Sequence, residues 1–325
     1  MTQPRRIASR ALGVIALFLL LALPRLALAD PGQSNATRVK FGLYVTSLSG
    51  IDPADGSFAI EGYAWFLSPP GARFDAAHDI ELFGRHVTMP PFVSKPLKDG
   101  HLYTVMTFSG VIDHAYDVSR YPFDRQDLQL HFEAARPAED ILFMPDVADT
   151  RIAREVRAPG FRVEGITLAT REQVYDTNFG HGGTRSAFSR LEVTLHLERT
   201  ISPLLFEKFT GYFVAFVIAA LVIFVPVSEL GTRIGMTTGA IFAAVFNLYR
   251  LEDAIGFDAV FGVVDRVSML VFSVILMQLA LSIWVNFRFR AGRHDVAMRV
   301  NYALGGLIAV MHGALLLVVF LDALR

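Results

Sequence analysis

Hydrophobic and polar positions alternate in the strands expected within residues 30–200. The clearest case is residues 190–199, where every second side chain is apolar, namely Leu191, Val193, Leu195 and Leu197. Residues 58–67 and 128–133 repeat this period of two, which is typical of a half-buried antiparallel strand. Turn residues separate these segments, and no helical periodicity intervenes. The pattern predicts an N-terminal all-β sandwich of the immunoglobulin-like type.

The pattern changes at residue 201, where long apolar runs replace the alternation. A helix of about 20 apolar residues spans the hydrocarbon core of a bilayer. The runs predict a four-helix transmembrane bundle over residues 201–325, with helices at about 209–227, 231–250, 259–286 and 301–324. The second run differs because it is rich in small and hydroxyl residues, such as Gly235, Thr237, Thr238 and Gly239. A helix of this composition is expected inside a bundle or against water, not in lipid on all sides.

Residues 1–29 have the layout of a secretory signal peptide. Three arginines precede a short apolar stretch, and Ala27-Leu28-Ala29 has the small residues of a cleavage site. An uncleaved anchor helix is the alternative. In either case, the residues that follow begin outside the inner membrane.

Charge then predicts the topology. If the N-terminal domain lies in the periplasm, four helices place the segment between the third and the fourth in the cytoplasm. That segment carries Arg288, Arg290, Arg293 and Arg299, in agreement with the positive-inside rule. The sequence therefore predicts a multi-pass protein of the bacterial inner membrane, embedded in the lipid bilayer.

Composition argues against several other classes of protein. The formal net charge is −1 and the part before the helices has no basic run, so we expect no nucleic acid partner. The sequence has no cysteine, which excludes disulfides and thiolate metal sites. Its nine histidines lack metal-binding spacing, and no catalytic motif is present. We therefore expect no enzyme activity, no catalytic residues, no metal and no cofactor.

The strongest local motif is Tyr121-Pro122-Phe123-Asp124, a turn that leads into an alternating strand. Alone, such a tetrapeptide is an ordinary β-turn. Here it precedes a strand that runs into the first of four membrane helices. In this motif and this order of elements, the chain resembles the bacterial pentameric ligand-gated ion channels of the Cys-loop receptor superfamily, over roughly residues 38–325. The cysteines that flank the turn in animal receptors are absent, as in other bacterial members.

The resemblance implies how the sandwich is coupled to the helices. In the family, the turn lies at the membrane end of the sandwich and its Asp pairs with an Arg that ends the last strand. Asp124 and Arg199 match these residues, although Arg199 could instead snorkel at the interface. The turn that contains Asp52 and Asp55 would lie beside the motif. Both turns would rest on the segment 252–257 between the second and third helices, the family's route from ligand to gate.

The resemblance also implies a pore-lining face on the second helix. Aligning Phe246-Asn247 with the same dipeptide in bacterial members gives the stripe Ile234, Thr238, Ile241, Val245 and Leu248. Its spacing of three or four residues keeps one face towards an axis. Five copies would place a hydroxyl ring at Thr238 and apolar rings nearby, which can gate by dewetting. A register shifted by one residue, which exposes Gly239 and Phe242, is the alternative.

Selectivity is expected to depend on carboxylates at the two mouths. Cation-selective members place a Glu ring at the cytoplasmic mouth, where Glu229 is the candidate, and Glu252 would add negative charge at the outer mouth. Arg233 lies one turn from Glu229, and in the family such a basic residue often faces away from the axis. The helix macrodipole alone also explains an acid at the position of Glu229.

Family agonists bind between neighbouring sandwiches, in an aromatic cage closed by the loop before the last strand. The candidate ligand-binding residues in that loop are Tyr175, Phe179, His181, Arg185 and Phe188. Aromatic faces can hold a cationic amine. The tryptophan usual on the preceding loop is missing, so Tyr175 and Phe179 could equally pack within a hairpin.

The expected function is that of a homopentameric ligand-gated channel, in which four identical subunits are the partners of each chain. It would pass ions, with cations favoured, when a periplasmic small molecule or proton binds. The alternative is a non-conducting, membrane-anchored periplasmic sensor or binding module with the same fold.

Overall fold

A computed structural model of the chain describes residues 36–180, 186–256 and 261–324, without the side chains of residues 91–92 and 201–206. The chain divides into two units, Met1–Ala36 and Thr37–Arg325, and the second holds every element named below. The signal peptide predicted for residues 1–29 lies outside the described residues.

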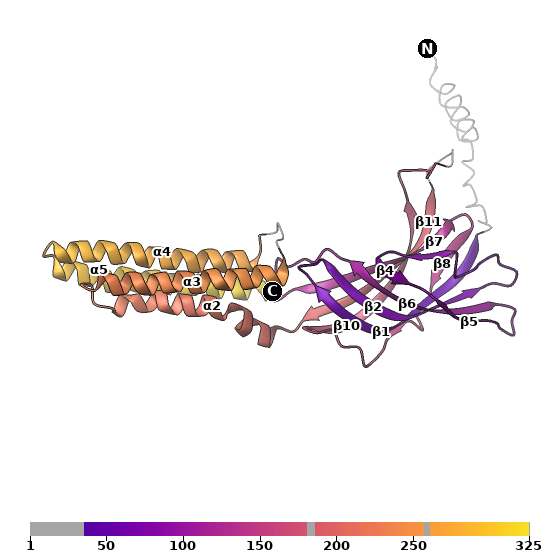
Figure 1. The fold of residues 1–325 in the computed structure, drawn as a ribbon, viewed down its shortest axis with the longest axis horizontal. Helices are drawn as coiled ribbons and strands as arrows, with labels where there is room; N and C mark the ends of the chain where they lie inside the picture. The colour runs from indigo at the N-terminus through magenta and orange to yellow at the C-terminus, as the bar shows by residue number, and fades with distance from the viewer. Residues whose placement is uncertain (1–35, 181–185, 257–260, 325) are drawn as a thin grey trace, which may run out of the picture. The chain divides into compact units, whose positions relative to one another are not determined.

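The strands form two sheets (Figure 1). The larger sheet has the order β4-β6-β2-β1-β8, with β5 paired to β6 and β9 paired to β1. Its strands are β1 (Thr37–Asp52), β2 (Ser57–Ser68), β4 (Arg85–Thr88), β5 (Pro91–Pro96), β6 (Leu102–Asp113), β8 (Ile141–Pro145) and β9 (Arg151–Ile152). The smaller sheet has the order β10-β11-β7-β3 and consists of β3 (Ile80–Leu82), β7 (Arg125–Pro137), β10 (Phe161–Val174) and β11 (Ala187–Arg199).

The apolar faces of the two sheets share one core. The side chains that alternate along β11, from Leu191 to Leu197, are buried, as their period of two predicts. The ring of Phe41 on β1 lies 4.4 Å from that of Phe66 and 5.0 Å from that of Phe132, between centroids. Because Phe132 belongs to the smaller sheet, this contact joins the sheets into a β-sandwich. Burial of each such side chain contributes about 2 kcal/mol.

The opposite face of the smaller sheet is polar. Three of the residue pairs that face one another across β7 and β11 there bring a basic and an acidic side chain into contact, namely Arg190 with Glu133, His196 with Asp127, and Arg125 with Glu198. The alternation in each strand therefore builds the core on one face and a ladder of polar pairs on the other.

Four helices follow the sandwich and lie side by side (Figure 1). They are α2 (Ile201–Leu221), which ends in the 3₁₀ turn η1 (Val222–Phe224), α3 (Leu230–Ile255), α4 (Val263–Arg290) and α5 (His294–Ala323). In the part of the chain that the structure describes, these four helices are long and apolar enough to cross a membrane. They support a multi-pass membrane protein.

The helices begin and end at residues different from those predicted. Helix α2 begins at Ile201 and α5 at His294, well before the predicted positions 209 and 301. Apolar runs mark only the part of a helix that can lie in hydrocarbon, whereas the hydrogen-bonded helix continues through polar residues. Helix α4 begins at Val263, after Gly262 donates its backbone N–H to Asp265 Oδ2 at 2.8 Å. Its predicted start at 259 lies outside the described residues.

Candidate functional site

Arg199 and Asp124 form a buried ion pair where the last strand leads into α2. Arg199 donates from Nε to Asp124 Oδ1 at 2.6 Å and from Nη2 to Oδ2 at 2.9 Å. The two side chains are 8% and 2% exposed. Gln126 also donates to Oδ2, and the guanidinium lies over the rings of Tyr121 and Phe161. Arg199 therefore does not snorkel, because its charge is enclosed and paired.

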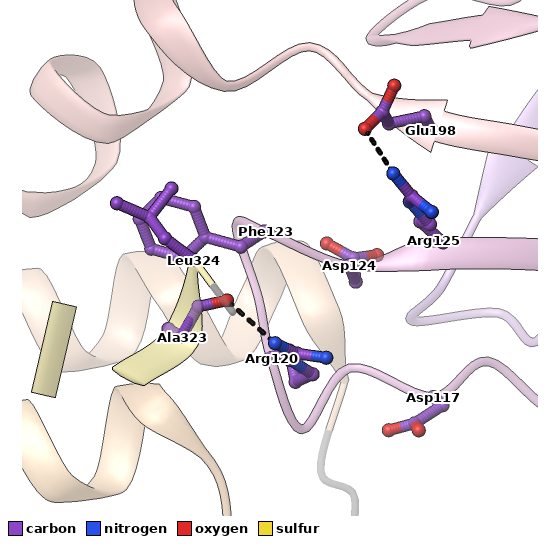
Figure 2. Close-up of a pocket in the computed structure, with 8 residues that line it drawn as sticks. All are labelled: Asp117, Arg120, Phe123, Asp124, Arg125, Glu198, Ala323 and Leu324. Carbon is purple, nitrogen blue, oxygen red and sulfur yellow. Dashed lines mark hydrogen bonds and ion pairs between the residues drawn. The ribbon is translucent and has the colours of Figure 1, made fainter. Parts of the chain in front are cut away.

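The turn that contains Tyr121, Pro122 and Phe123 contacts the end of α5. The Phe123 ring lies 6.2 Å from that of Phe320, between centroids. Arg120 donates to the carbonyl of Ala323 at 3.1 Å, as Figure 2 shows. A cavity of about 360 Å³ lies between this turn and the end of the helix. The turn thus joins the sandwich to the helices directly.

Asp52 and Asp55 hold the turn between β1 and β2. Asp52 Oδ1 accepts hydrogen bonds from the backbone N–H groups of Ala54 and Asp55, at 2.9 and 3.1 Å. Asp55 Oδ2 accepts from Ser57 at 2.6 Å and from Arg85 at 3.1 Å. The hydrogen bond from Ser57, and next the charge of Arg85, hold the pKa of Asp55 below its ordinary value. The two acids therefore fix the shape of the turn.

Two glycines bring the connection between α3 and α4 against these turns. At Gly256, which has φ +76°, an added Cβ would lie 3.1 Å from the Cα of Ala54. At Gly262, an added Cβ would lie 2.5 Å from the carbonyl oxygen of Ser119. That carbonyl accepts the backbone N–H of Val263 at 2.8 Å. Each end of the connection therefore contacts one turn of the sandwich, backbone to backbone; residues 257–260 lie outside the described part.

Helix α3 has one buried stripe and one uncovered face. The buried residues recur every three or four positions and are Arg233, Thr237, Ala240, Ala244, Asn247 and Leu251. Of the predicted pore stripe, Ile234 and Thr238 are exposed, whereas Ile241, Val245 and Leu248 are half-buried at the edge of the uncovered face. The most exposed large apolar side chains of the helix are Phe242 (60%), Phe246 (70%) and Tyr249 (63%). Residues of both predicted registers are therefore uncovered in a single chain.

The two candidate selectivity residues lie at opposite ends of α3. Glu229 precedes the helix and is exposed, and Glu252 lies in the last turn and is half-buried. Arg233 is only 1% exposed and points into the bundle, where it donates to the carbonyl of Val225 and to Asn301 Oδ1. Its charge is thus kept away from the uncovered face.

The aromatic candidates for ligand binding contact one another. The rings of Tyr175, Phe179 and Phe188 meet edge to face, with centroids 5.2 to 6.0 Å apart. The Tyr175 hydroxyl donates to Glu133 Oε1 at 2.8 Å and accepts from Arg190 Nη2 at 2.9 Å. In one chain these rings therefore pack within the hairpin, beside a buried carboxylate. His181 and Arg185 lie outside the described residues.

Gly256 lies within the segment 252–257 that the sequence analysis placed at the junction. Sequence reasoning did not identify Gly262, Ser119 and Arg120 as residues of the junction, nor Glu133 and Arg190 as residues beside the aromatic cluster. A glycine at each end of a short interhelical connection was the only available signal for the first group. For the second group, opposite charges on two alternating strands were the signal.

No model of a known protein family matches the chain, and a search of curated proteins found no matching sequence.

Proposed function

We propose that the chain is a subunit of a homopentameric ligand-gated ion channel. Its sandwich is of the immunoglobulin-like type and lies in the bacterial periplasm, and its helices cross the inner membrane. A small molecule or a proton bound by the sandwich opens a cation-selective pore lined by α3. The second candidate is a non-conducting sensor or binding module, which would use the same junction without a pore.

The uncovered face of α3 is the observation that carries the proposal. Besides its aromatic side chains, this face exposes Gly231, Thr232, Gly235, Thr238 and Gly239. Glycine and hydroxyl side chains gain little from lipid tails and are typical of helix–helix and helix–water contacts. Copies of the chain arranged around an axis would cover part of this face and leave the rest to water.

The contacts between sandwich and helices support coupling. Movement of the β1–β2 turn or of the turn around Pro122 would act on the connection between α3 and α4, because Gly256 and Gly262 leave no space between the backbones. The buried pair Asp124–Arg199 makes the turn around Pro122 rigid. A change in the sandwich is therefore passed on to the helices and is not lost in movement of that turn.

The charges near α3 favour cations. Exposed Glu229 would form a carboxylate ring at the cytoplasmic mouth, where it would concentrate cations and repel anions. Arg233 does not oppose this effect, because its guanidinium donates to groups inside the bundle.

The absence of cysteine allows a clean test of the pore. Single cysteines are placed at Thr238, Ile241 and Val245 in the full chain, reconstituted in liposomes and treated with a charged, membrane-impermeant thiol reagent. Matched controls are Ala240, which is buried, and Val310, which is exposed on α5. We expect modification at the first three positions and none at the controls, with native mass measurements giving five chains.

Two outcomes would redirect the proposal. Modification at Gly239→Cys and Phe242→Cys instead would move the register by one residue and keep the channel. Protection of every α3 position, in a folded protein, would favour the non-conducting module.

A further inference from the structure

His114 and Ala115 line three neighbouring cavities of the sandwich. The first, of about 440 Å³, lies against the polar face of β7 and is also lined by Asp127 and His131. The second, of about 660 Å³, adds His196. We call the first two cavities the histidine groove. The third, of about 270 Å³, lies between the β1–β2 turn and Gly256, so the same two residues border both the groove and the junction with the helices.

The imidazoles of His196 and His131 in the groove differ in their hydrogen bonds. In His196, Nδ1 contacts Asp127 Oδ1 at 2.7 Å and Nε2 contacts Thr167 Oγ1 at 3.1 Å. In His131, Nδ1 is buried and has no hydrogen-bond partner among the residues that the structure describes. A buried polar atom without a partner is costly and calls for an explanation.

Protonation would destabilise the observed position of the His131 ring. An imidazolium carries N–H groups on both nitrogens, so Nδ1 would become a charged, buried donor with no acceptor. Burial accordingly lowers the pKa of His131 below its ordinary value of 6.5, and Arg190 and Arg171 add to the effect. A proton can therefore be accommodated only if the ring moves.

Acceptors and space for that movement are present. Glu192 on β11 lies opposite His131 in the strand register, and it contacts Arg171 of β10 at 3.3 Å. Asp127 lines the same cavity, four residues earlier on the same face of β7. The remaining charged groups that face His131 are Arg190 of β11 and Glu133 of β7, which are paired with each other at 2.7 Å.

His114 connects the groove to the junction. Its backbone N–H donates to the carbonyl of Gly56 at 2.8 Å, and its ring meets that of Tyr116 at 4.7 Å between centroids. Tyr116 in turn donates to the carbonyl of Ser57 at 2.7 Å. Burial lowers the pKa of His114, and Asp127 is the charged group that opposes this shift. A change in the groove thus acts directly on the β1–β2 turn.

We propose that the histidine groove is a proton-binding site, in which His131 takes up the proton and turns towards Glu192 while His114 passes the change to the junction. The consequence for gating rests on the proposed channel function, whereas proton binding by the groove does not depend on that function.

The direction of the pH effect follows from linkage. A histidine whose pKa is lowered in one conformation holds fewer protons there than in any conformation where its pKa is ordinary. The described conformation therefore loses stability as the pH falls through about 6.5. Above that pH its stability is unchanged by this group, because His131 is neutral in both conformations.

The test uses the full chain in lipid nanodiscs and liposomes, from about pH 7.5 to pH 5. Wild type is compared with His131→Gln, Glu192→Gln and the control His78→Gln, whose side chain is 82% exposed. Thermal unfolding and cation flux are both followed. We expect Tm to fall with acidification in wild type and in the control, and to fall less in His131→Gln. The pH of half-maximal flux should move down by about one unit in Glu192→Gln.

The two readouts separate the two proposals. If His131→Gln and Glu192→Gln follow wild type at every pH in both readouts, the proton site is refuted and the channel is unaffected. If the fall of Tm on acidification is smaller in His131→Gln than in wild type while no variant passes ions, the proton site stands and the channel function fails. If His131→Gln does not assemble, an unchanged response in Glu192→Gln is sufficient to refute the site.

Discussion

The side-chain oxygen of Asn247 accepts a hydrogen bond from the backbone nitrogen of Gly211 at 3.0 Å, which ties α3 to α2. An added Cβ at Gly211 would lie 2.7 Å from both Cβ and Oδ1 of Asn247. The helices approach this closely because position 211 has no side chain. The contact holds α3 by its buried stripe, so that its opposite face remains uncovered.

Gly211→Ala should therefore push α3 away from α2. We expect the free energy of unfolding to fall by about 1–3 kcal/mol, the usual cost of overpacking, measured as a lower Tm in detergent. Gly306→Ala on α5 is the matched control, because no atom lies within 4 Å of its added Cβ. Equal Tm values for the two variants would show that the helices can separate without cost.

Asp124→Asn should destabilise the sandwich strongly. The substitution leaves the guanidinium of Arg199 buried without its counter-charge, which costs about 3–5 kcal/mol. Chemical denaturation of the purified protein measures the loss.

Arg125→Gln is the control for that change. It breaks a contact with Glu198 in which the Arg125 side chain is 79% exposed, so it should cost about 1 kcal/mol or less. A similar loss in both variants would contradict a special role for the buried pair.

Gly262→Ala should uncouple the sandwich from the helices. The new methyl group would displace the carbonyl of Ser119 from the N–H of Val263, while the core of each part stays intact. We expect assembly to be retained and ligand- or proton-dependent flux to be lost. Gly165→Ala, with no atom within 4 Å of the added Cβ, should conduct like wild type. Normal gating in Gly262→Ala would remove this contact from the coupling route.

Tyr116→Phe should change the response to alkali. Burial raises the pKa of Tyr116, so above about pH 10 the unfolded chain releases a proton that the folded chain keeps, and the free energy of unfolding falls. Phenylalanine has no such proton, so the fall should be smaller. At neutral pH the lost bond to Ser57 should cost about 1 kcal/mol. Tm measured from neutral to alkaline pH tests both statements, and identical curves would contradict them.

The parts of the fold that depend on local pattern could be predicted from the sequence. The alternation from Leu191 to Leu197 correctly identified a strand and its buried face. The apolar runs identified four helices but placed the starts of α2 and α5 too late, because hydropathy reports the lipid contact and not the hydrogen bonds that define Ile201 and His294 as helix starts.

Contacts between distant segments could not be predicted in the same way. The pairing of Asp124 with Arg199 came only from a family resemblance, and the approach of Gly262 to Ser119 had no sequence signal beyond the glycine itself. Whether Ile241 or Phe242 faces the axis of the proposed channel would be decided by neighbouring subunits, since Ile241 is only half-buried and Phe242 is exposed in one chain. Likewise, the ring of Tyr175 packs on its neighbours here, and a cage would need the adjacent sandwich.

Ion flux through the purified protein in liposomes tests the central claim most directly. Wild type is compared with Ile241→Ser on α3 and with Val310→Ser on the exposed face of α5. We predict that Ile241→Ser leaks cations where wild type is closed or gated, because a polar ring wets the pore, and that Val310→Ser behaves like wild type. If none of the three passes an ion under any condition while all remain folded oligomers, the protein is not a channel.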